Sequence, residues 1–324
     1  MFELKYRLFD GEKIRNGAVV TVENGIITKI RDCDVSECDD GILMPTLIDA
    51  HAHMENTEHI SEMLRNGIGA VCDVSASGVL AEQSKDLEIV RSAGMAMGIV
   101  MNPKTYVEKA VMNGAKYIKV LLFNTFSVGK SALCGIVKVA HDKNLKVAVH
   151  ATEISTVKQA VEADADILLH VPMKEKIPLD LAKLIAEKKI AVVPTLVMME
   201  TFANSTRKGF KPEDYRNARN NVELLHECGV TVLAGTDANS GSFAPAVLYG
   251  KTLHREMKLL SEAGLTPVEV LRAATLKNAE AFGLNAGKIE VGAPATMTLA
   301  KLNSEDGFNI EKIKNVWIKG KQIL

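Results

Sequence analysis

The sequence predicts an α/β protein, namely a (β/α)8 TIM-like barrel with a small β-sandwich domain built from both chain termini. Eight short apolar runs alternate with amphipathic helical segments through the middle of the chain. Polar residues collect near the carboxyl ends of these runs, where a barrel builds its active site. Both ends of the chain show the alternation that is typical of β-strands.

The two ends of the chain predict β-structure. The stretch GAVVTVENGIITKI places Asn24 and Gly25 between two β-branched runs, which indicates a β-hairpin. Near the other end, ATMTLAKL and NVWIKGKQIL are separated by a polar turn region. Because neither end has enough apolar residues for a core of its own, we expect residues 1–43 and 291–324 to combine into one discontinuous β-domain. Residues 44–290 would then form the barrel domain.

The middle of the chain supplies the predicted barrel strands. Runs that are apolar on both faces and separated by helices are typical of a parallel sheet covered by helices. An open, doubly wound sheet is the alternative, but no GxGxxG follows the first run, which removes its usual cofactor signature. The eight runs are LMPTLIDAH (43–51), IGAVCDVSA (68–76), GMAMGIVM (94–101), KYIKVLLF (116–123), KVAVHA (146–151), DILLHVP (166–172), IAVVPTL (190–196) and VTVLAGTDA (230–238).

Two helical stretches follow the eighth run, at residues 246–264 and 266–283. In the second, Thr266 is a candidate N-cap, with Pro267 at the first helical position and Glu269 at the third. This combination predicts a capping box at the start of the helix.

Composition and charge narrow the possible partners. The chain has 324 residues, with 39 basic and 40 acidic residues that are well mixed, and a formal net charge of -1. We therefore expect neither a nucleic-acid nor a membrane partner, because no basic or acidic surface is indicated. A small-molecule substrate is expected instead, and a homo-oligomer remains open.

The cysteines and the hydropathy pattern predict a cytoplasmic location. The five cysteines are scattered without a CxxC pair, which favours a reducing compartment. The N-terminal stretch MFELKYRLFDGEKI carries charges throughout and has no apolar core of a signal peptide. No segment approaches the roughly 18 apolar residues that a membrane span needs.

His51 and His53 follow the first apolar run directly. Residues two apart on a strand point to the same face, so the two imidazoles would project side by side. This pattern is typical of metal ligands, although a hydrogen-bonded polar pair at a strand end explains it equally well.

Lys119 lies inside the fourth run, between Ile118 and Val120. A lysine in the middle of a buried strand is costly as a cation, so it must be neutral, paired, chemically modified or bound to something. His150, His170 and Asp237 lie at or near the carboxyl ends of the fifth, sixth and eighth runs. A lone histidine would be an ordinary core residue, but a barrel would bring all these nitrogen and oxygen donors to one mouth.

Several motifs of the chain resemble those of the amidohydrolase superfamily, nearest to its imidazolonepropionase-like and prolidase-like branch of metal-dependent hydrolases. MPTLIDAHAH is similar to the strand-one motif, YIKVL to the strand-four lysine motif, VAVHA and ILLH to the later histidine motifs, and LAGTDA to the strand-eight aspartate motif. AGLTPVEVLRAATLKNAEAFGL and GKIEVGAPA resemble the C-terminal signature. The match runs through nearly the whole chain.

The resemblance implies a centre of two divalent metal ions, zinc first, with manganese, nickel or iron as alternatives. It implies a carboxylated Lys119 whose carbamate bridges the metals, together with a bridging hydroxide, and Asp237 as the general base. The implied ligand set is His51, His53 and Asp237 for the more buried metal, His150 and His170 for the more exposed one, and Lys119 between them.

The function implied by this resemblance is hydrolysis of an amide or other C–N bond of a small molecule, such as an N-acyl amino acid, an Xaa-Pro type dipeptide or a cyclic amide. No GxSxG nucleophile motif competes with it. The alternatives are an aromatic or heterocycle deaminase, for which Glu153 is the candidate acid, a lactone or phosphotriester hydrolase, and a non-catalytic barrel homologue. The candidate substrate contacts are Asn124, Thr125, Thr195 and Asn239.

Overall fold

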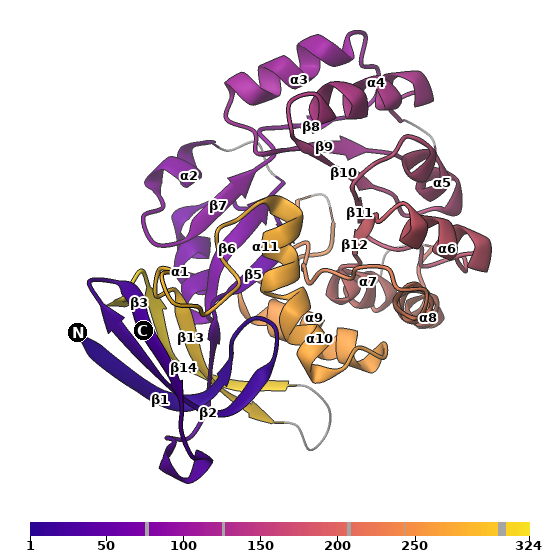
Figure 1. The fold of residues 1–324 in the computed structure, drawn as a ribbon. Coiled ribbons are helices and arrows are strands. Elements are labelled where there is room, and N and C mark those ends of the chain that lie inside the picture. Colours follow the sequence, from indigo (N-terminus) through magenta and orange to yellow (C-terminus); the bar gives the residue numbers. More distant parts are fainter. Residues whose placement is uncertain (75–77, 125–126, 206–208, 243, 304–308) are drawn as a thin grey trace.

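The computed structural model describes residues 1–74, 78–124, 127–205, 209–242, 244–303 and 309–324. It shows an α/β fold in which one part of the chain is a largely antiparallel sheet and the other consists of parallel strands and helices (Figure 1). In the described residues the strands form sheets of seven, five and three strands.

The seven-stranded sheet contains strands from both ends of the chain, in the order β15-β14-β13-β4-β1-β2-β3. β13 pairs antiparallel with β4, and both termini lie beside this sheet in Figure 1. Its strands are β1 (Phe2–Phe9), β2 (Ile14–Glu23), β3 (Ile26–Asp32), β4 (Ile42–Pro45), β13 (Met297–Asn303), β14 (Asn309–Ile318) and β15 (Lys321–Gln322). The division of the chain into a terminal domain and a barrel domain stays a prediction.

The hairpin predicted at Asn24 and Gly25 is confirmed, because these two residues join β2 and β3. Their φ angles are 50° and 80°, which is the left-handed conformation that a tight hairpin turn requires. On one face of the sheet, Leu8, Val20 and Trp317 belong to a single buried cluster. Burial of that face holds the two chain ends together.

The other two sheets are parallel. β5 (Leu47–Ala52), β6 (Ile68–Asp73) and β7 (Glu88–Arg91) form the three-stranded sheet. β8 (Met95–Ala96), β9 (Tyr117–Leu121), β10 (Lys146–His150), β11 (Ile167–Leu169) and β12 (Ala191–Val193) form the five-stranded sheet. Every residue of β5 and β6 is buried, as expected for strands that are covered on both faces.

Helices follow most of the parallel strands, and α3 to α6 lie outside β8–β12 in Figure 1. The helices are α1 (Thr57–Arg65), α2 (Gly78–Gln83), α3 (Pro103–Met112), α4 (Lys130–His141), α5 (Ile154–Glu162), α6 (Leu179–Glu187), α7 (Leu196–Ala203), α8 (Pro212–Glu227), α9 (Lys251–Glu262), α10 (Pro267–Ala273) and α11 (Leu276–Phe282), with a short 3-10 helix η1 (Val35–Glu37).

The predicted capping box is confirmed at the start of α10. The Thr266 side chain accepts a hydrogen bond from the Glu269 backbone N–H, and the Glu269 carboxylate accepts one from the Thr266 backbone. The stretch 266–283 is two helices rather than one, because the chain leaves the helical conformation at Thr275 (φ -137°, ψ -93°).

The third predicted strand is confirmed only at Met95 and Ala96, which pair in parallel with β9, and its predicted extent is wrong. The strand that pairs with β6 is β7 at residues 88–91, whereas only Met95 and Ala96 of the expected run 94–101 form a strand. The apolar side chains of Met97, Ile99 and Met101 are 56%, 82% and 90% exposed. Residues 94–101 therefore have the apolar composition of a buried strand, but most of their large side chains are exposed to solvent.

Residues 231–238 connect the two parallel sheets. Leu233 N donates to Val192 O of β12 at 2.8 Å, and Asp237 N donates to His51 O of β5 at 2.7 Å. Across the described residues no strand pairing joins β7 to β8, so the paired strands do not form one closed barrel. One backbone hydrogen bond, from Lys116 N before β9 to Arg91 O of β7 at 2.9 Å, links the two sheets on this side.

Candidate metal centre

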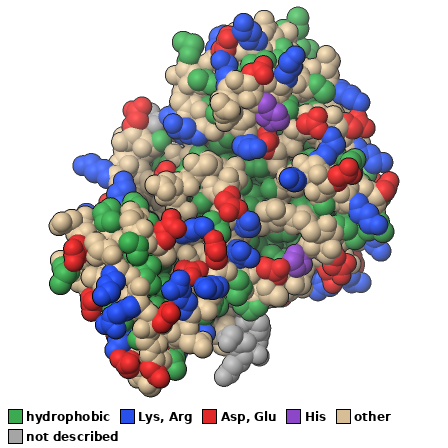
Figure 2. Space-filling model, in the orientation of Figure 1, with side chains coloured by type: hydrophobic (Ala, Val, Ile, Leu, Met, Phe, Trp, Pro, Cys, Tyr) green, Lys and Arg blue, Asp and Glu red, His purple; other side chains and the backbone are tan. Residues whose placement is uncertain are grey.

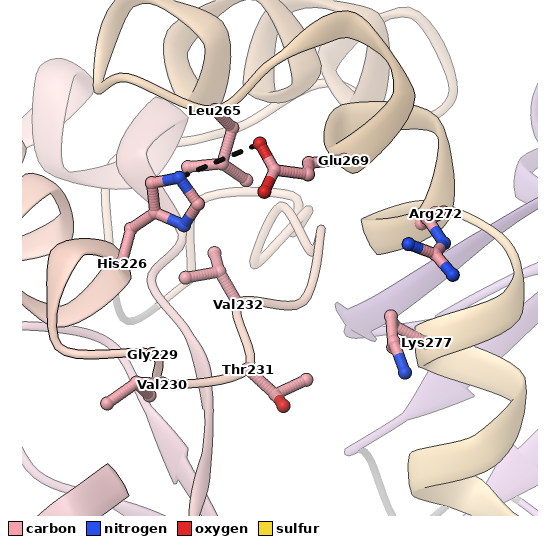
Figure 3. A pocket seen from close by; sticks show the side chains of 9 residues that line it. All are labelled: His226, Gly229, Val230, Thr231, Val232, Leu265, Glu269, Arg272 and Lys277. Atoms are coloured by element: carbon pink, nitrogen blue, oxygen red, sulfur yellow. Dashed lines mark ion pairs between the residues drawn. The ribbon is translucent and has the colours of Figure 1, made fainter. Parts of the chain in front are cut away.

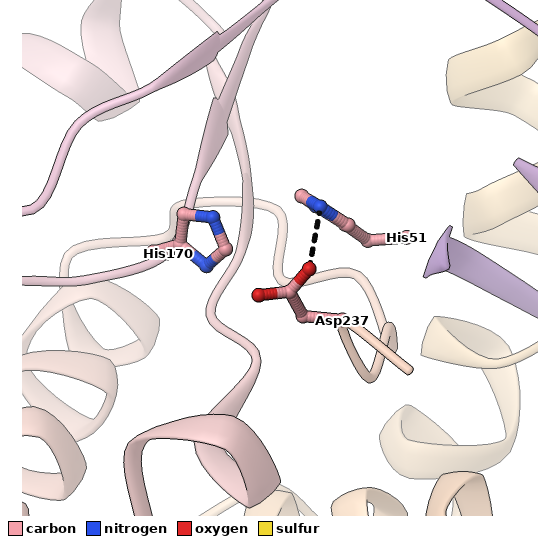
Figure 4. A group of neighbouring side chains, drawn as sticks. All are labelled: His51, His170 and Asp237. Carbon is pink, nitrogen blue, oxygen red and sulfur yellow. Dashed lines mark ion pairs between the residues drawn. The ribbon is translucent and has the colours of Figure 1, made fainter. Parts of the chain in front are cut away.

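The carboxyl ends of the parallel strands bring four histidines and one aspartate together. His51 lies on β5 and is 1% exposed, and His53 follows directly after that strand. Both Nε2 atoms lie near one oxygen of Asp237, since the His51 distance to Oδ1 is 3.1 Å and the His53 distance is 3.0 Å. Figure 4 shows the Asp237 carboxylate directed at His51.

His150 and His170 come to the same place from β10 and from the end of β11. The ring of His170 lies 4.9 Å from that of His51 and 4.6 Å from that of His150, measured between centroids. Ligand atoms of His51, His170 and Asp237 all lie within 4.8 Å of one another. These residues, which lie far apart in the sequence, therefore share one site (Figure 4).

Lys119 joins this group from β9. It pairs in register with Ala148 of β10, two residues before His150, so its side chain points to the same face as that of His150. Burial lowers the pKa of Lys119 to about 7, and the charge of Asp237 opposes this shift. The shift makes the neutral amine of Lys119 more accessible near neutral pH than that of an ordinary lysine.

Three of the histidines, His51, His150 and His170, are kept neutral by their surroundings. Burial, followed by the positive charge of Lys119, lowers the pKa of His51 to about 4 and that of His150 to about 3. Burial and then His150 hold the pKa of His170 well below its usual range. Neutral imidazole is the form that coordinates a metal.

Asp237 is kept ionised. Burial on its own would raise the pKa of this carboxyl, but the electrostatic interaction with His51 and the hydrogen bonds with His51 and His53 bring the pKa well below its usual value. The site thus presents a carboxylate among neutral imidazoles, which is a ligand set that divalent zinc or manganese accepts.

The geometry fits a metal ion. Two ligands about 2.1 Å from a tetrahedral metal are separated by roughly 3.4 Å, and the two Nε2 to Oδ1 distances at Asp237 are close to that value. The Nε2 atom of His150 is buried and has no hydrogen-bond partner in the part of the chain that the structure describes, and the same is true of the His51 Nδ1 atom. A buried polar nitrogen without a partner is costly unless it binds something.

His170 is oriented by Thr195 and, behind it, by Glu256. The Thr195 hydroxyl lies 2.7 Å from His170 Nδ1, which leaves Nε2 for the cluster. The Glu256 carboxylate accepts hydrogen bonds from the backbone N–H groups of Leu196 at 3.0 Å and Val197 at 2.7 Å, and so caps α7 directly after Thr195. Such outer partners fix the ring orientation and tautomer of metal-binding histidines.

Asp49 holds the backbone of His51 in place through hydrogen bonds. Its carboxylate accepts hydrogen bonds from the His51 backbone N–H, the Thr236 backbone N–H and the Thr236 hydroxyl, and this ties β5 to the segment that carries Asp237. Burial raises the pKa of Asp49 to about 7.

The supporting residues Asp49, Thr236 and Glu256 were not identified from the sequence. A signal existed for Asp49, which lies two residues before His51 on the same strand face.

The backbone is strained at this edge of the sheets. His170, Thr195 and Asp237 have φ angles of 73°, 51° and 58°. Residues other than glycine rarely adopt this left-handed conformation, and it is least favourable for a β-branched residue such as Thr195. Because observed strain concentrates where the surroundings hold it in place, it supports a functional role for these strand ends.

The four predicted substrate-contact residues differ in their exposure and in their hydrogen-bond partners. Asn124 is exposed, and its side chain accepts a hydrogen bond from Ser155 at 2.6 Å. Thr125 lies outside the described residues. Thr195 is fully buried against His170, and the Asn239 side chain bonds back to its own loop, including Asp237 O at 2.8 Å. The burial of Thr195 favours an orienting role over direct substrate contact.

A separate pocket lies at the opposite ends of the strands (Figure 3). It is lined partly by residues 230–232, which begin the segment that Asp237 ends, and by His226, Glu269, Arg272 and Lys277. His226 and Glu269 face each other across it at 3.6 Å. It therefore lies away from the histidine cluster, and we assign no chemistry to it.

The face of the molecule seen in Figure 2 carries charges of both signs. Figure 2 shows acidic and basic side chains intermingled over the visible face, in agreement with the formal net charge of -1. In the described residues, none of the helices is both long and apolar enough to span a membrane.

The sequence matches the family model described as "Amidohydrolase family" over residues 42–323, which is most of the chain. The chain belongs to the amidohydrolase family. It is accordingly a hydrolase acting on carbon–nitrogen bonds, and the resemblance drawn from its motifs is confirmed. None of the curated proteins compared with this amidohydrolase matches it in sequence.

Solved structures support the fold. A Xaa-Pro dipeptidase with bound methionine in its active site has a TM-score of 0.83 at 20% identity, over 99% of this chain and 98% of that one. A putative prolidase from Bifidobacterium longum and an A. niger ochratoxinase both have a TM-score of 0.80, at 20% and 19% identity, over 99% of this chain and 94% of theirs. At these identities the similarity shows a common fold.

Proposed function

We propose that this amidohydrolase is a binuclear metal-dependent hydrolase that cleaves an amide bond of a small molecule, with its strands arranged as a (β/α)8 barrel. The observation that carries the proposal is the convergence of neutral histidines, an ionised Asp237 and a buried Lys119 of lowered pKa at one edge of the parallel strands.

We assign the ligands to the two metals as the resemblance implies. His51, His53 and Asp237 would hold one metal, because the Nε2 atoms of His51 and His53 lie 3.1 Å and 3.0 Å from Asp237 Oδ1. His150 and His170 would hold the other, and Lys119 would lie between the two groups. Zinc is the first choice for such nitrogen and oxygen donors, with manganese, nickel or iron as alternatives.

Lys119 is suited to carboxylation. A neutral amine can attack carbon dioxide and form a carbamate with the loss of one proton, and burial supplies the neutral amine by lowering the pKa of Lys119 to about 7. The carbamate is an anion with two oxygens, so it would remove the cost of a buried cation and offer one oxygen to each metal.

The reaction then depends on the chain's own residues. When bound, the metals act as Lewis acids that activate water and polarise the substrate carbonyl. Asp237, which is ionised and lies beside His51 and His53, accepts a proton from the attacking water and delivers it to the leaving nitrogen. The hydrogen bond that His170 Nδ1–H donates to the Thr195 hydroxyl oxygen holds this ring in place during the transfer.

The substrate class we propose is an Xaa-Pro type dipeptide, an N-acyl amino acid or a cyclic amide. Structures of similar fold include a Xaa-Pro dipeptidase with bound methionine and a prolidase complexed with N-methylphosphonate-L-proline. Asn124, Thr125 and Asn239 remain candidate contacts. A cytoplasmic location and a possible homo-oligomer also remain part of the proposal.

Deamination and lactone or phosphotriester hydrolysis are the alternatives on the same site. One observation weighs against the deaminase. The Glu153 carboxylate accepts a hydrogen bond from the Thr156 hydroxyl at 3.3 Å, and Glu153 is the N-cap of α5, so this candidate acid is engaged in the helix start. A barrel that has lost catalysis is disfavoured because all six predicted ligand positions carry competent residues.

The test is a substrate panel on protein loaded with zinc or manganese, comprising Xaa-Pro dipeptides, N-acyl amino acids, cyclic amides, lactones, phosphotriesters and heterocyclic amines. We expect turnover of at least one amide and its loss in Asp237→Asn. Release of ammonia from a heterocycle, or turnover of lactones alone, would overturn the amide proposal. An amide hydrolysis that persists unchanged in Asp237→Asn would remove Asp237 as the base and contradict the proposed mechanism.

A further inference from the structure

Two of the five cysteines meet at the end of β3. Cys33 follows the last residue of β3 and Cys38 follows η1, and their sulfur atoms lie 3.7 Å apart. The Cys38 thiol also lies 3.6 Å from Asp34 O, as a donor to that carbonyl. The sequence does not reveal this pair, because four residues separate the cysteines and the turn of η1 brings them together.

The neighbouring strand leaves room for the two sulfurs. Gly17 of β2 faces them, and Cys33 N donates to Gly17 O at 3.2 Å. A Cβ atom at Gly17 would lie 2.9 Å from Cys38 Sγ and 2.6 Å from Cys33 O, closer than real Cβ contacts allow. A side chain at this position would therefore push the turn and its cysteines away.

Accessibility and charge at the pair favour thiol chemistry. Both cysteines are partly exposed, so a small oxidant reaches them, whereas Cys72 is buried. The Lys5 ammonium is close enough to interact electrostatically with both sulfurs. Burial and the contact with Cys33 raise the pKa of Cys38, so we assign Cys33 as the attacking sulfur.

We propose that Cys33 and Cys38 form a modification site, at which a peroxide oxidises the two thiols to an intramolecular disulfide. The Cys33 thiolate attacks one peroxide oxygen, which breaks the O–O bond, forms a sulfenic acid and releases water or an alcohol after protonation. The Cys38 thiolate then attacks the Cys33 sulfur, forms the S–S bond and displaces hydroxide, which takes up a proton and leaves as water. Two thiols are oxidised and one peroxide is reduced, and a small thiol reverses the reaction by exchange.

The disulfide would close a ring around η1, in the segment that leads from β3 into β4. This segment also contacts β1, through Asp39 N donating to Lys5 O at 3.0 Å and through Lys5 Nζ and Glu37 at 2.6 Å. The modification would therefore fix an edge of the seven-stranded sheet and not the histidine cluster.

The experiment treats the full-length protein with hydrogen peroxide in increasing amounts, counts free thiols after unfolding and maps the cross-linked peptides by mass spectrometry. We expect two of the five thiols to be lost first, and a peptide that links Cys33 to Cys38 with the mass loss of two hydrogen atoms. Dithiothreitol should restore both thiols.

Three variants make the test specific. Cys33→Ser and Cys38→Ser should each abolish the rapid loss of two free thiols on peroxide treatment. Cys134→Ser, which removes an exposed lone cysteine, should leave that loss unchanged. Gly17→Ala should slow the linkage, because its Cβ would displace the pair. Separate oxidation of Cys33 and Cys38 without a link, or a loss no faster than that of Cys134, would overturn the proposal.

Discussion

Ionisable residues are buried in the parallel strands around the histidine cluster but lie at the surface of the seven-stranded sheet. In the parallel strands, Asp49, His51 and Lys119 are each no more than 2% exposed. In the sheet, charged residues lie on the surface as exposed pairs such as Lys301 with Glu311, and the buried face is apolar.

Backbone strain divides in the same way. In the sheet, a left-handed residue such as Asn24 lies in a hairpin turn, where the conformation is ordinary. At the strand ends, His170, Thr195 and Asp237 adopt it in the buried cluster. Buried polar groups and backbone strain both lower the stability of the folded protein, so their concentration around the histidine cluster indicates a functional site. The seven-stranded sheet, with its apolar buried face, contributes mainly to stability. Mutations in the two regions should therefore have different effects.

The largest effect on activity is expected for Asp237→Asn. The amide keeps the shape but cannot accept the proton, so kcat should fall by about 10²- to 10⁴-fold, while the Tm changes little. The measurement is steady-state kinetics of the metal-loaded variant beside a thermal melt. Asp40→Asn, at an exposed pair with Lys314 in the sheet, is the control and should keep kcat. Unchanged turnover in Asp237→Asn would remove it as the base.

Lys119→Ala should act on metal content. Without the lysine no carbamate can form, so we expect the chain to lose roughly one metal ion, with partial recovery when short carboxylic acids are added. Metal analysis of the dialysed protein measures this. Lys116→Ala is the matched control, since Lys116 is exposed next to the same strand and should have no effect. A full metal content in Lys119→Ala would argue against a bridging lysine.

A smaller effect is expected for Thr195→Val, which keeps a β-branched shape but removes the hydrogen bond to His170. Loss of such an outer partner should weaken metal affinity by about 10- to 100-fold, as measured by competition with a chelator. Glu256→Gln should weaken it less, because an amide oxygen can still accept one of the two backbone hydrogen bonds. Thr201→Val on the same helix should leave the affinity unchanged, and an equal loss there would show a general effect on α7.

In the seven-stranded sheet, Trp317→Ala should change stability and leave catalysis alone. The Trp317 side chain is 6% exposed in the sheet's apolar cluster, so its truncation should cost about 3 to 5 kcal/mol of unfolding free energy. Denaturant unfolding measures the loss, and Trp317→Phe should lose less. A large fall in kcat for the folded variant would contradict the separation of the two regions.

Local signals in the sequence predicted the parts of the fold that depend on neighbouring residues. The hairpin at Asn24 and Gly25 and the capping box at Thr266 are set by residues within a few positions, and both are confirmed. The predicted extent of the third strand was wrong because an apolar run does not reveal whether its side chains will be covered, as the exposure of Ile99 shows.

The candidate ligands could be proposed from the sequence because the carboxyl ends of parallel strands meet at one edge, so donors such as His150 and Asp237 can be collected strand by strand. The residues that orient these candidate ligands could not all be predicted in this way. Glu256 reaches the α7 N-terminus from a position 60 residues further along the chain, and no local pattern marks that contact. The approach of Cys33 and Cys38 likewise depends on the shape of a turn.

The most direct test of the account is elemental analysis of metal per chain, on protein grown with added zinc or manganese and bicarbonate. The account predicts about two metal ions per chain, held at the histidine cluster and reduced in Lys119→Ala. A well-folded protein that holds one ion or none, and takes up no more when metal is added, would contradict it.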